Sequence, residues 1–192
     1  MILKRRFYRR DTAKVAQELL GKVLCHEVDG YVLKGKIVET EAYYGENDPG
    51  SHAFIGMTPR NSVMYGEAGF SYVYFTYGMH HMLNVVTERV GVAGAVLIRA
   101  VEPLEGIYFM KKRRRTDDIR NLTTGPGKLT QAFGIDLSHN GLDLTNGPLR
   151  IMKGDKPKEI VRTGRIGINQ GKELQLRFCV KDSPFLSRKN YL

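Results

Sequence analysis

Two glutamates, Glu39 and Glu41, alternate in the strand-like run VETEAYYG, and Tyr43 follows at the same spacing. Successive side chains of a β-strand point to opposite faces, so we expect these three residues to share one face. Ile37 is expected on that face too, with Val38, Thr40 and Ala42 on the other. A carboxylate partly buried among aromatic side chains can act as a general base, because desolvation raises its pKa towards neutrality. The alternative is that both glutamates point to solvent or pair with arginine.

A second cluster, YVYFTYGMHH, places aromatic side chains and two imidazoles around a glycine turn. Aromatic rings at such a turn can stack on nucleic-acid bases or wedge between them. Tyr77 and His80 lie nearest the turn, whereas Tyr72 and Tyr74 could equally be ordinary sheet aromatics. Adjacent His80 and His81 would face opposite ways in a strand, so we expect no metal site.

Two cations complete the set of candidate site residues. Arg99 ends the apolar run AVLI, so its guanidinium needs an anionic or polar partner to offset desolvation. Glu41 is the obvious candidate, although a purely structural Arg–Glu pair would give the same pattern. Lys128 lies in the first turn of a short helix entered through GPG, where free backbone N–H groups favour a phosphate. The segment lacks the GxxxxGK[ST] pattern of a nucleotide-triphosphate loop.

The elements that must position these residues are short. We predict a helix capped at Asp11 or Thr12 and ending at Gly21, and a hairpin of strands 22–28 and 31–43 turning at Asp29-Gly30. A long loop, 45–69, precedes further strands. The remaining predicted strands are 70–79, 82–88, 94–103, and short ones near 148–152, 159–168 and 174–180; the remaining helices begin at Pro103 and cover 126–133. The fold class is therefore α+β, with a mostly antiparallel sheet and a few short helices.

The bulk composition limits the classes of function. The 192 residues suit a single domain, 1–192, with residues 1–10 expected to be a flexible basic N-terminus. We find no apolar run long enough for a membrane span and no secretory signal, so the protein is not expected to be secreted. Cys25 and Cys179 are expected to be buried thiols. A net charge of +10 favours a polyanionic partner such as nucleic acid, although basic residues can also serve solubility alone.

Several motifs together resemble the eukaryotic type of alkyladenine (3-methyladenine) DNA glycosylases. In order they are VETEAYYG, SHAF, TPRN, YVYFTYGMHHMLN, VLIRAVEPLEG, GPGKLTQAFGI and RIGI, and the similarity ends near KDSPFLS. The resemblance implies a curved sheet like that of formyltransferase C-terminal domains. It implies a monomeric, cofactor-free enzyme that flips alkylated or deaminated purines out of double-stranded DNA, with no membrane or obligate protein partner. Its location would be cytoplasmic at the nucleoid in a prokaryote, or nuclear in a eukaryote.

The resemblance also implies roles for individual residues. Glu41 would activate the water that attacks the sugar, and Arg99 would help to position that water. Tyr43 and His80 would sandwich the extruded base, and His52 would contact its edge. The remaining implied roles are a pocket wall at Tyr74, exclusion of a purine 2-amino group by Asn84, a wedge at Tyr77 helped by Met64, and a phosphate contact at Lys128.

The sequence departs from the resemblance at His80, where the family has a tyrosine, which puts the range of accepted lesions in question. Alkylated purines such as 3-methyladenine and 7-methylguanine leave readily, whereas neutral hypoxanthine would need a general acid that the sequence does not identify. No lysine near Glu41 suggests a Schiff base, so hydrolysis without strand cleavage is expected. Two alternatives remain open: a non-catalytic nucleic-acid-binding module, and a hydrolase of nucleosides or RNA on a related scaffold.

Overall fold

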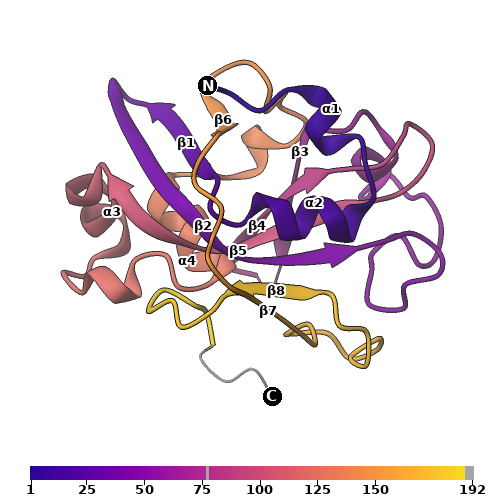
Figure 1. Ribbon diagram of the computed structural model, residues 1–192. Helices are drawn as coiled ribbons and strands as arrows, with labels where there is room; N and C mark the ends of the chain where they lie inside the picture. The colour runs from indigo at the N-terminus through magenta and orange to yellow at the C-terminus, as the bar shows by residue number, and fades with distance from the viewer. Residues whose placement is uncertain (77, 189–192) are drawn as a thin grey trace.

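An antiparallel sheet of eight strands forms the framework of the computed structural model, which describes residues 1–76 and 78–188 (Figure 1). The sheet order is β3-β4-β5-β2-β1-β6; β8 also pairs with β2, and β7 pairs with β8. The strands are β1 (Val23–Val28), β2 (Tyr31–Tyr43), β3 (Ser71–Thr76), β4 (His80–Val86), β5 (Ala95–Glu105), β6 (Leu149–Met152), β7 (Ile160–Thr163) and β8 (Arg177–Val180). This arrangement confirms the α+β prediction, whereas the likeness to formyltransferase domains stays a prediction.

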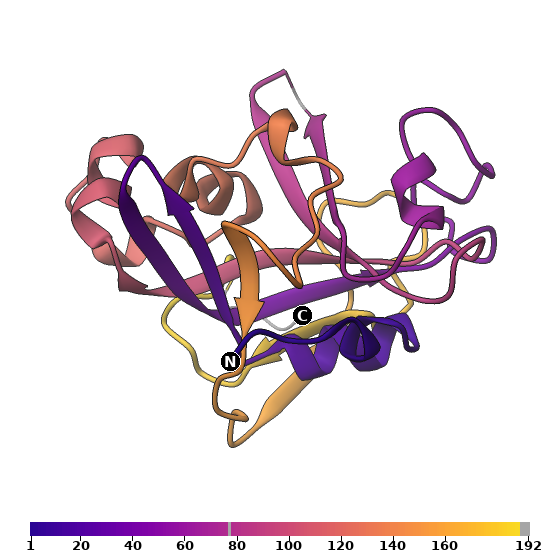
Figure 2. The same ribbon diagram turned by 90° about the horizontal axis from the view of Figure 1, so that it is seen from above.

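The helices are short and pack on the curled sheet (Figure 2). They are α1 (Arg5–Tyr8), α2 (Thr12–Leu19), α3 (Ile107–Arg114), α4 (Pro126–Phe133), and the 3₁₀ turns η1 (Ser62–Tyr65), η2 (Ile119–Asn121) and η3 (Leu137–His139). Helix α2 packs on β2 and β5, and α4 packs on β4 and β5. None of the described helices is long and apolar enough to cross a membrane.

Local sequence signals explain the ends of α2 and the turn of the first hairpin. Asp11 caps α2 by accepting a hydrogen bond from the Lys14 backbone N–H, and Gly21 follows the helix with a φ of +82°. A Cβ at Gly21 would lie 1.9 Å from the Asp155 carbonyl oxygen, so only glycine fits there. Asp29 and Gly30 both have positive φ, as a tight two-residue hairpin requires.

The predicted helix start at Pro103 is wrong. Strand β5 continues to Glu105, and α3 begins only after Gly106, whose φ is +75°. The register of β5 against β2 shifts between Pro103 and Glu105, so Leu104 is an extra residue there. Proline is tolerated at such an irregularity of a strand because the ladder does not use its missing N–H.

Two β-bulges interrupt the pairing of β2 with β5 beside the candidate carboxylates. Ile37 pairs with Val101 and Glu39 with Ala100, so Val38 is an extra residue in β2. The bulge puts Ile37 in the main core, whereas Val38 packs with Ala100 in a small separate cluster. The expectation that Ile37 shares the face of Glu39 is therefore wrong, because a bulge resets the two-residue alternation. The second extra residue is Arg99 in β5, between the pairs of Ala100 and Ile98.

Residues 1–10, which were expected to be flexible, pack on the rest of the fold. Leu3 and Tyr8 are buried in the main core, and Ile2 bridges to Met152 of β6. Cys25 and Cys179 are free and buried, as predicted.

Candidate active site

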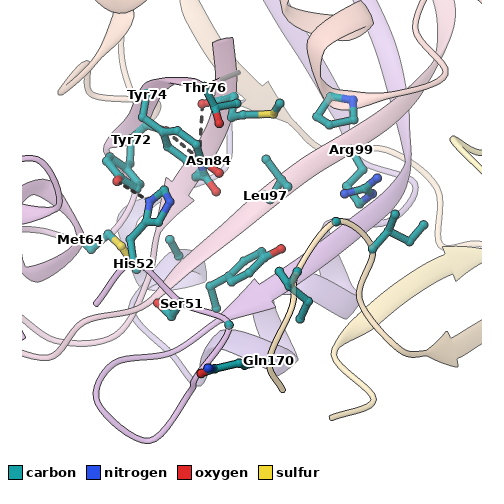
Figure 3. A pocket seen from close by; sticks show the side chains of 18 of the residues that line it. Ser51, His52, Met64, Tyr72, Tyr74, Thr76, Asn84, Leu97, Arg99 and Gln170 are labelled. Carbon is teal, nitrogen blue, oxygen red and sulfur yellow. Dashed lines mark hydrogen bonds between the residues drawn. The ribbon is translucent and has the colours of Figure 1, made fainter. Parts of the chain in front are cut away.

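A cavity of about 530 Å³ opens among strands β2 to β5, and Figure 3 shows its lining. This volume lies within the range of small-molecule sites. The walls come from the four strands, from loop residues 49–52, from the first residue of α4 and from the segment 166–170. The long loop and the central strands thus meet at one site.

One wall of the cavity is aromatic. The His52 and Tyr74 rings meet edge to face with centroids 4.5 Å apart, and the Tyr72 and Tyr74 rings are 5.3 Å apart. The Tyr72 hydroxyl lies 3.1 Å from His52 Nδ1, which fixes the imidazole plane. Burial lowers the pKa of His52 below its ordinary value, and nearby Arg60 lowers it further. A neutral imidazole is therefore favoured, and it would not repel a cationic ligand.

Glu41 lies behind the cavity wall, with a fully buried side chain. Its Oε2 accepts hydrogen bonds from the Tyr43 hydroxyl at 2.7 Å and from Arg99 Nη1 at 3.2 Å. Its Oε1 accepts one from the backbone N–H of Ile166 at 2.7 Å. Tyr43, Arg99 and Ile166 all line the cavity, whereas Glu41 is not among the lining residues. The carboxylate is therefore one hydrogen bond away from the cavity.

Glu39 is the second buried carboxylate, and it fixes Arg99 from behind. Its Oε1 accepts from Arg99 Nε at 3.0 Å, from Arg177 Nε at 2.8 Å and from the Ser187 hydroxyl at 2.7 Å, while Oε2 accepts from the Ser187 N–H at 2.6 Å. Burial alone would raise the pKa of Glu39, but attraction by Arg99 and Arg177 outweighs it and leaves the pKa below its ordinary value. Arg99 Nη2 also donates to the Ser187 hydroxyl, so each guanidinium nitrogen has an assigned partner.

A further buried ion pair supports the other side of the site. Arg165 donates to both carboxylate oxygens of Asp48 at 2.6 Å, and both side chains are almost completely buried. The Arg165 guanidinium also lies 4.6 Å from the centre of the Tyr43 ring. Because Ile166 follows Arg165, this pair holds both the tyrosine and the backbone N–H that contact Glu41.

The structure brings most of the predicted site residues together. Tyr43, His52, Tyr74, Asn84 and Arg99 all line the cavity. Met64 lines it as well, and its side chain is buried in the wall.

Two predicted residues lie elsewhere. His80 is exposed and packs against Gly127 of α4, where an added Cβ would lie 2.8 Å from its Nδ1, and it is not among the residues that line the cavity. The Lys128 ammonium donates to the Asn121 side chain and does not line the cavity. Tyr77 lies outside the described residues.

Sequence reasoning missed the residues that support the site from a distance along the chain. Arg165 and Ile166 belong to the run RIGI, and Ser187 ends KDSPFLS, so both segments were noted without a role. Asp48 gave no signal beyond lying in a long loop. Among the described residues, no group of three or more His, Cys, Asp or Glu side chains is placed to hold a metal ion.

The cavity with its aromatic wall could hold a flat ring beside the Glu41–Arg99 pair, and the net charge of +10 favours a polyanionic partner. Similarity to known proteins identifies the class as DNA glycosylases. The sequence pattern of methylpurine-DNA glycosylases matches residues 6–184. The chain therefore belongs to the methylpurine-DNA glycosylase family.

Similar proteins come from bacteria and from an archaeon. A protein of Carboxydothermus hydrogenoformans, assigned as a 3-methyladenine DNA glycosylase, is 53% identical over 192 residues, covering 98% of this chain and 100% of the relative. A protein of Prosthecochloris aestuarii with the same assignment is 50% identical, covering 98% and 92%. One from Methanoculleus marisnigri is 47% identical, covering 98% and 100%.

Proposed function

We propose that this DNA glycosylase flips alkylated purines out of duplex DNA and hydrolyses their bond to deoxyribose with a water activated by Glu41. The observation that carries the proposal is the contact of the Glu41 carboxylate with Arg99, whose guanidinium lines an aromatic cavity. The names of the relatives support 3-methyladenine as a substrate. We extend the class to 7-methylguanine and, with lower rates, to hypoxanthine.

The proposed reaction needs little beyond orientation and a base. Alkylation of a purine ring nitrogen makes the base cationic and a good leaving group. The water oxygen forms a bond to C1′, the electron pair of the C1′–N bond leaves with the purine, and the proton of the water passes to Glu41. Extrusion costs least at a damaged, weakly paired base, so flipping itself contributes selectivity.

The extruded base would lie between Tyr43 and the His52–Tyr74 wall. Tyr74 thereby takes the role that the sequence resemblance gave to His80, because His80 lies outside the cavity. A neutral His52 suits a cationic purine. Asn84 would crowd a 2-amino group, since its amide is held by the backbone oxygens of Tyr72 and Met82.

Three further roles rest on the family resemblance. Tyr77 would fill the gap left by the extruded base. Lys128 would contact a phosphate once it leaves Asn121. The enzyme would act as a monomer, without a cofactor and without cleaving the strand.

Replacing Glu41 with glutamine tests the proposal, because the amide keeps the shape of the side chain but cannot accept a proton. We expect release of free base from a duplex with one 3-methyladenine or hypoxanthine to fall by about 10²–10⁴-fold. Binding to the same duplex should change little. Glu105→Gln is the matched control, since Glu105 is exposed and pairs with Lys34.

Retention of most activity in Glu41→Gln would contradict the assignment of the base. The two alternative functions give different results with the unmodified protein. A non-catalytic module would bind the duplex and release no purine. A hydrolase of nucleosides or RNA would act on those substrates faster than on the duplex.

A further inference from the structure

Three large apolar side chains are exposed within four positions of the loop that supplies His52. Ile55 is 79% exposed, Met57 60% and Phe54 43%. Single exposed apolar residues are common on protein surfaces, but a cluster of them marks an interaction site. We call residues 51–61 the pocket loop.

The pocket loop is held in this shape by its own buried residue, Asn61. The Asn61 amide donates to the backbone oxygens of His52 at 2.8 Å and Gly56 at 2.9 Å, and its Oδ1 accepts from the Thr58 N–H at 2.7 Å. Gly56 has a φ of +85°, which closes the turn between Ile55 and Met57. A turn stabilised by hydrogen bonds therefore holds the apolar side chains in contact with solvent.

The pocket loop lies beside the mouth of the cavity. Its Arg60 donates to the backbone oxygen of Phe75 at 3.3 Å and lies 5.7 Å from the Tyr74 ring, so the loop is attached to β3. In Figure 2, the loop and the β3–β4 hairpin rise on the same side of the sheet. The hairpin carries two more exposed apolar residues, Phe75 at 43% and Met79 at 70%.

We propose that the pocket loop inserts Ile55 and Met57 into the groove of the duplex beside the extruded nucleotide and contacts the adjoining base step. This inference rests on the proposed function. Flipping one nucleotide exposes the apolar faces of its neighbours, and apolar wedges stabilise such unstacked steps. The occupant is duplex DNA because the loop continues the rim of the cavity that would receive the base, on a chain with a net charge of +10.

The test compares Ile55→Ser/Met57→Ser with a control of similar polarity change, Leu104→Ser/Leu137→Ser. Leu104 and Leu137 are 47% and 53% exposed and do not line the cavity. We expect the pocket-loop variant to bind a duplex with one hypoxanthine about tenfold more weakly, in line with the loss of one base contact. The control should bind like the unmodified protein. Base release from a single-stranded oligonucleotide should be unchanged in both variants.

A second readout reports on the base step directly. 2-Aminopurine next to the lesion brightens when it unstacks, and the pocket-loop variant should reduce that increase. The inference would be overturned if the pocket-loop variant and the control bound the duplex with equal affinity. It would also be overturned if the pocket-loop variant lost as much activity on a single-stranded oligonucleotide as affinity for the duplex. A mass in sedimentation that falls from dimer to monomer in the pocket-loop variant would instead identify a second copy as the occupant. If the unmodified protein binds lesion duplex but releases no base, the proposed function fails. The comparison of duplex affinities between the two variants still tests whether the pocket loop contacts DNA.

Discussion

Glu39→Gln probes how the buried charges hold the site together. Glutamine keeps the volume of Glu39 but removes the negative charge that faces Arg99 and Arg177, whose side chains are 9% and 2% exposed. The amide nitrogen of glutamine is a donor, so it cannot accept a hydrogen bond from a group that now donates to the carboxylate, such as the Ser187 N–H. We expect Glu39 to act through Arg99, as a positioning residue.

The magnitude follows from the burial of these partners. Removing one member of a buried ion pair leaves an uncompensated charge and costs about 3–5 kcal/mol. For a chain of this size, each kcal/mol lowers the melting temperature by about 2–4 °C, so the variant should melt about 6–20 °C lower. Because the pKa of Glu39 lies below its ordinary value near 4.5, its contribution to stability is present above that value and is lost as the pH falls through its pKa in the folded protein. The stability of the variant should therefore lack this part of its decrease at acid pH.

Thermal and urea unfolding of the unmodified protein and of Glu39→Gln, at pH 7 and pH 4, measure both effects. Below the melting temperature of the variant, we expect the single-turnover rate of base release to fall while the affinity for lesion duplex is kept. Ser187→Ala, which removes one donor to Glu39, should reproduce the rate effect in weaker form with a smaller loss of stability. A destabilisation below about 1 kcal/mol would refute the reasoning, because it would mean that the buried arginines do not need this charge.

Three further results are expected. Asp48→Asn should destabilise the protein by about 3–5 kcal/mol in urea unfolding, because it leaves the buried Arg165 cation without its full counter-charge; a change within experimental error would contradict the importance of the pair. By NMR, His52 should titrate below 6.5, so the stability linked to it is full above that pH and declines as the pH falls below it. Tyr43→Phe should keep base release within about tenfold, since the ring remains, and a loss as large as that of Glu41→Gln would instead indicate proton transfer through the hydroxyl.

The sequence predicted the parts of the fold that depend on neighbouring residues. The Asp29-Gly30 hairpin and α4 were located because turn residues and helix ends carry local signals. The bulge at Val38 was not predictable, because it depends on how β2 pairs with β5. The continuation of β5 from Pro103 to Glu105 was missed for the same reason.

The candidate site likewise contains residues that local sequence patterns predict and residues that only long-range contacts bring together. Glu41, Tyr43 and Arg99 could be proposed because their types and spacing are visible within single strands. The contacts of Glu39 with Ser187 span 148 positions, and Asp48 meets Arg165 over 117, so no local pattern reveals them. His80 does not line the cavity, so the role that the resemblance implies for it stays a prediction.

The hydrogen bonds of Glu41 indicate where the attacking water would approach. A carboxylate offers about four acceptor positions. Among the described residues, Oε2 accepts from both Tyr43 and Arg99, whereas Oε1 accepts from the Ile166 N–H alone. Oε1 therefore has more capacity left for a water, and it lies beside the segment 166–170, which forms part of the cavity wall. Because Arg165 and Asp48 hold the start of that segment, we expect the buried ion pair to stabilise the wall beside Oε1 as well as the fold.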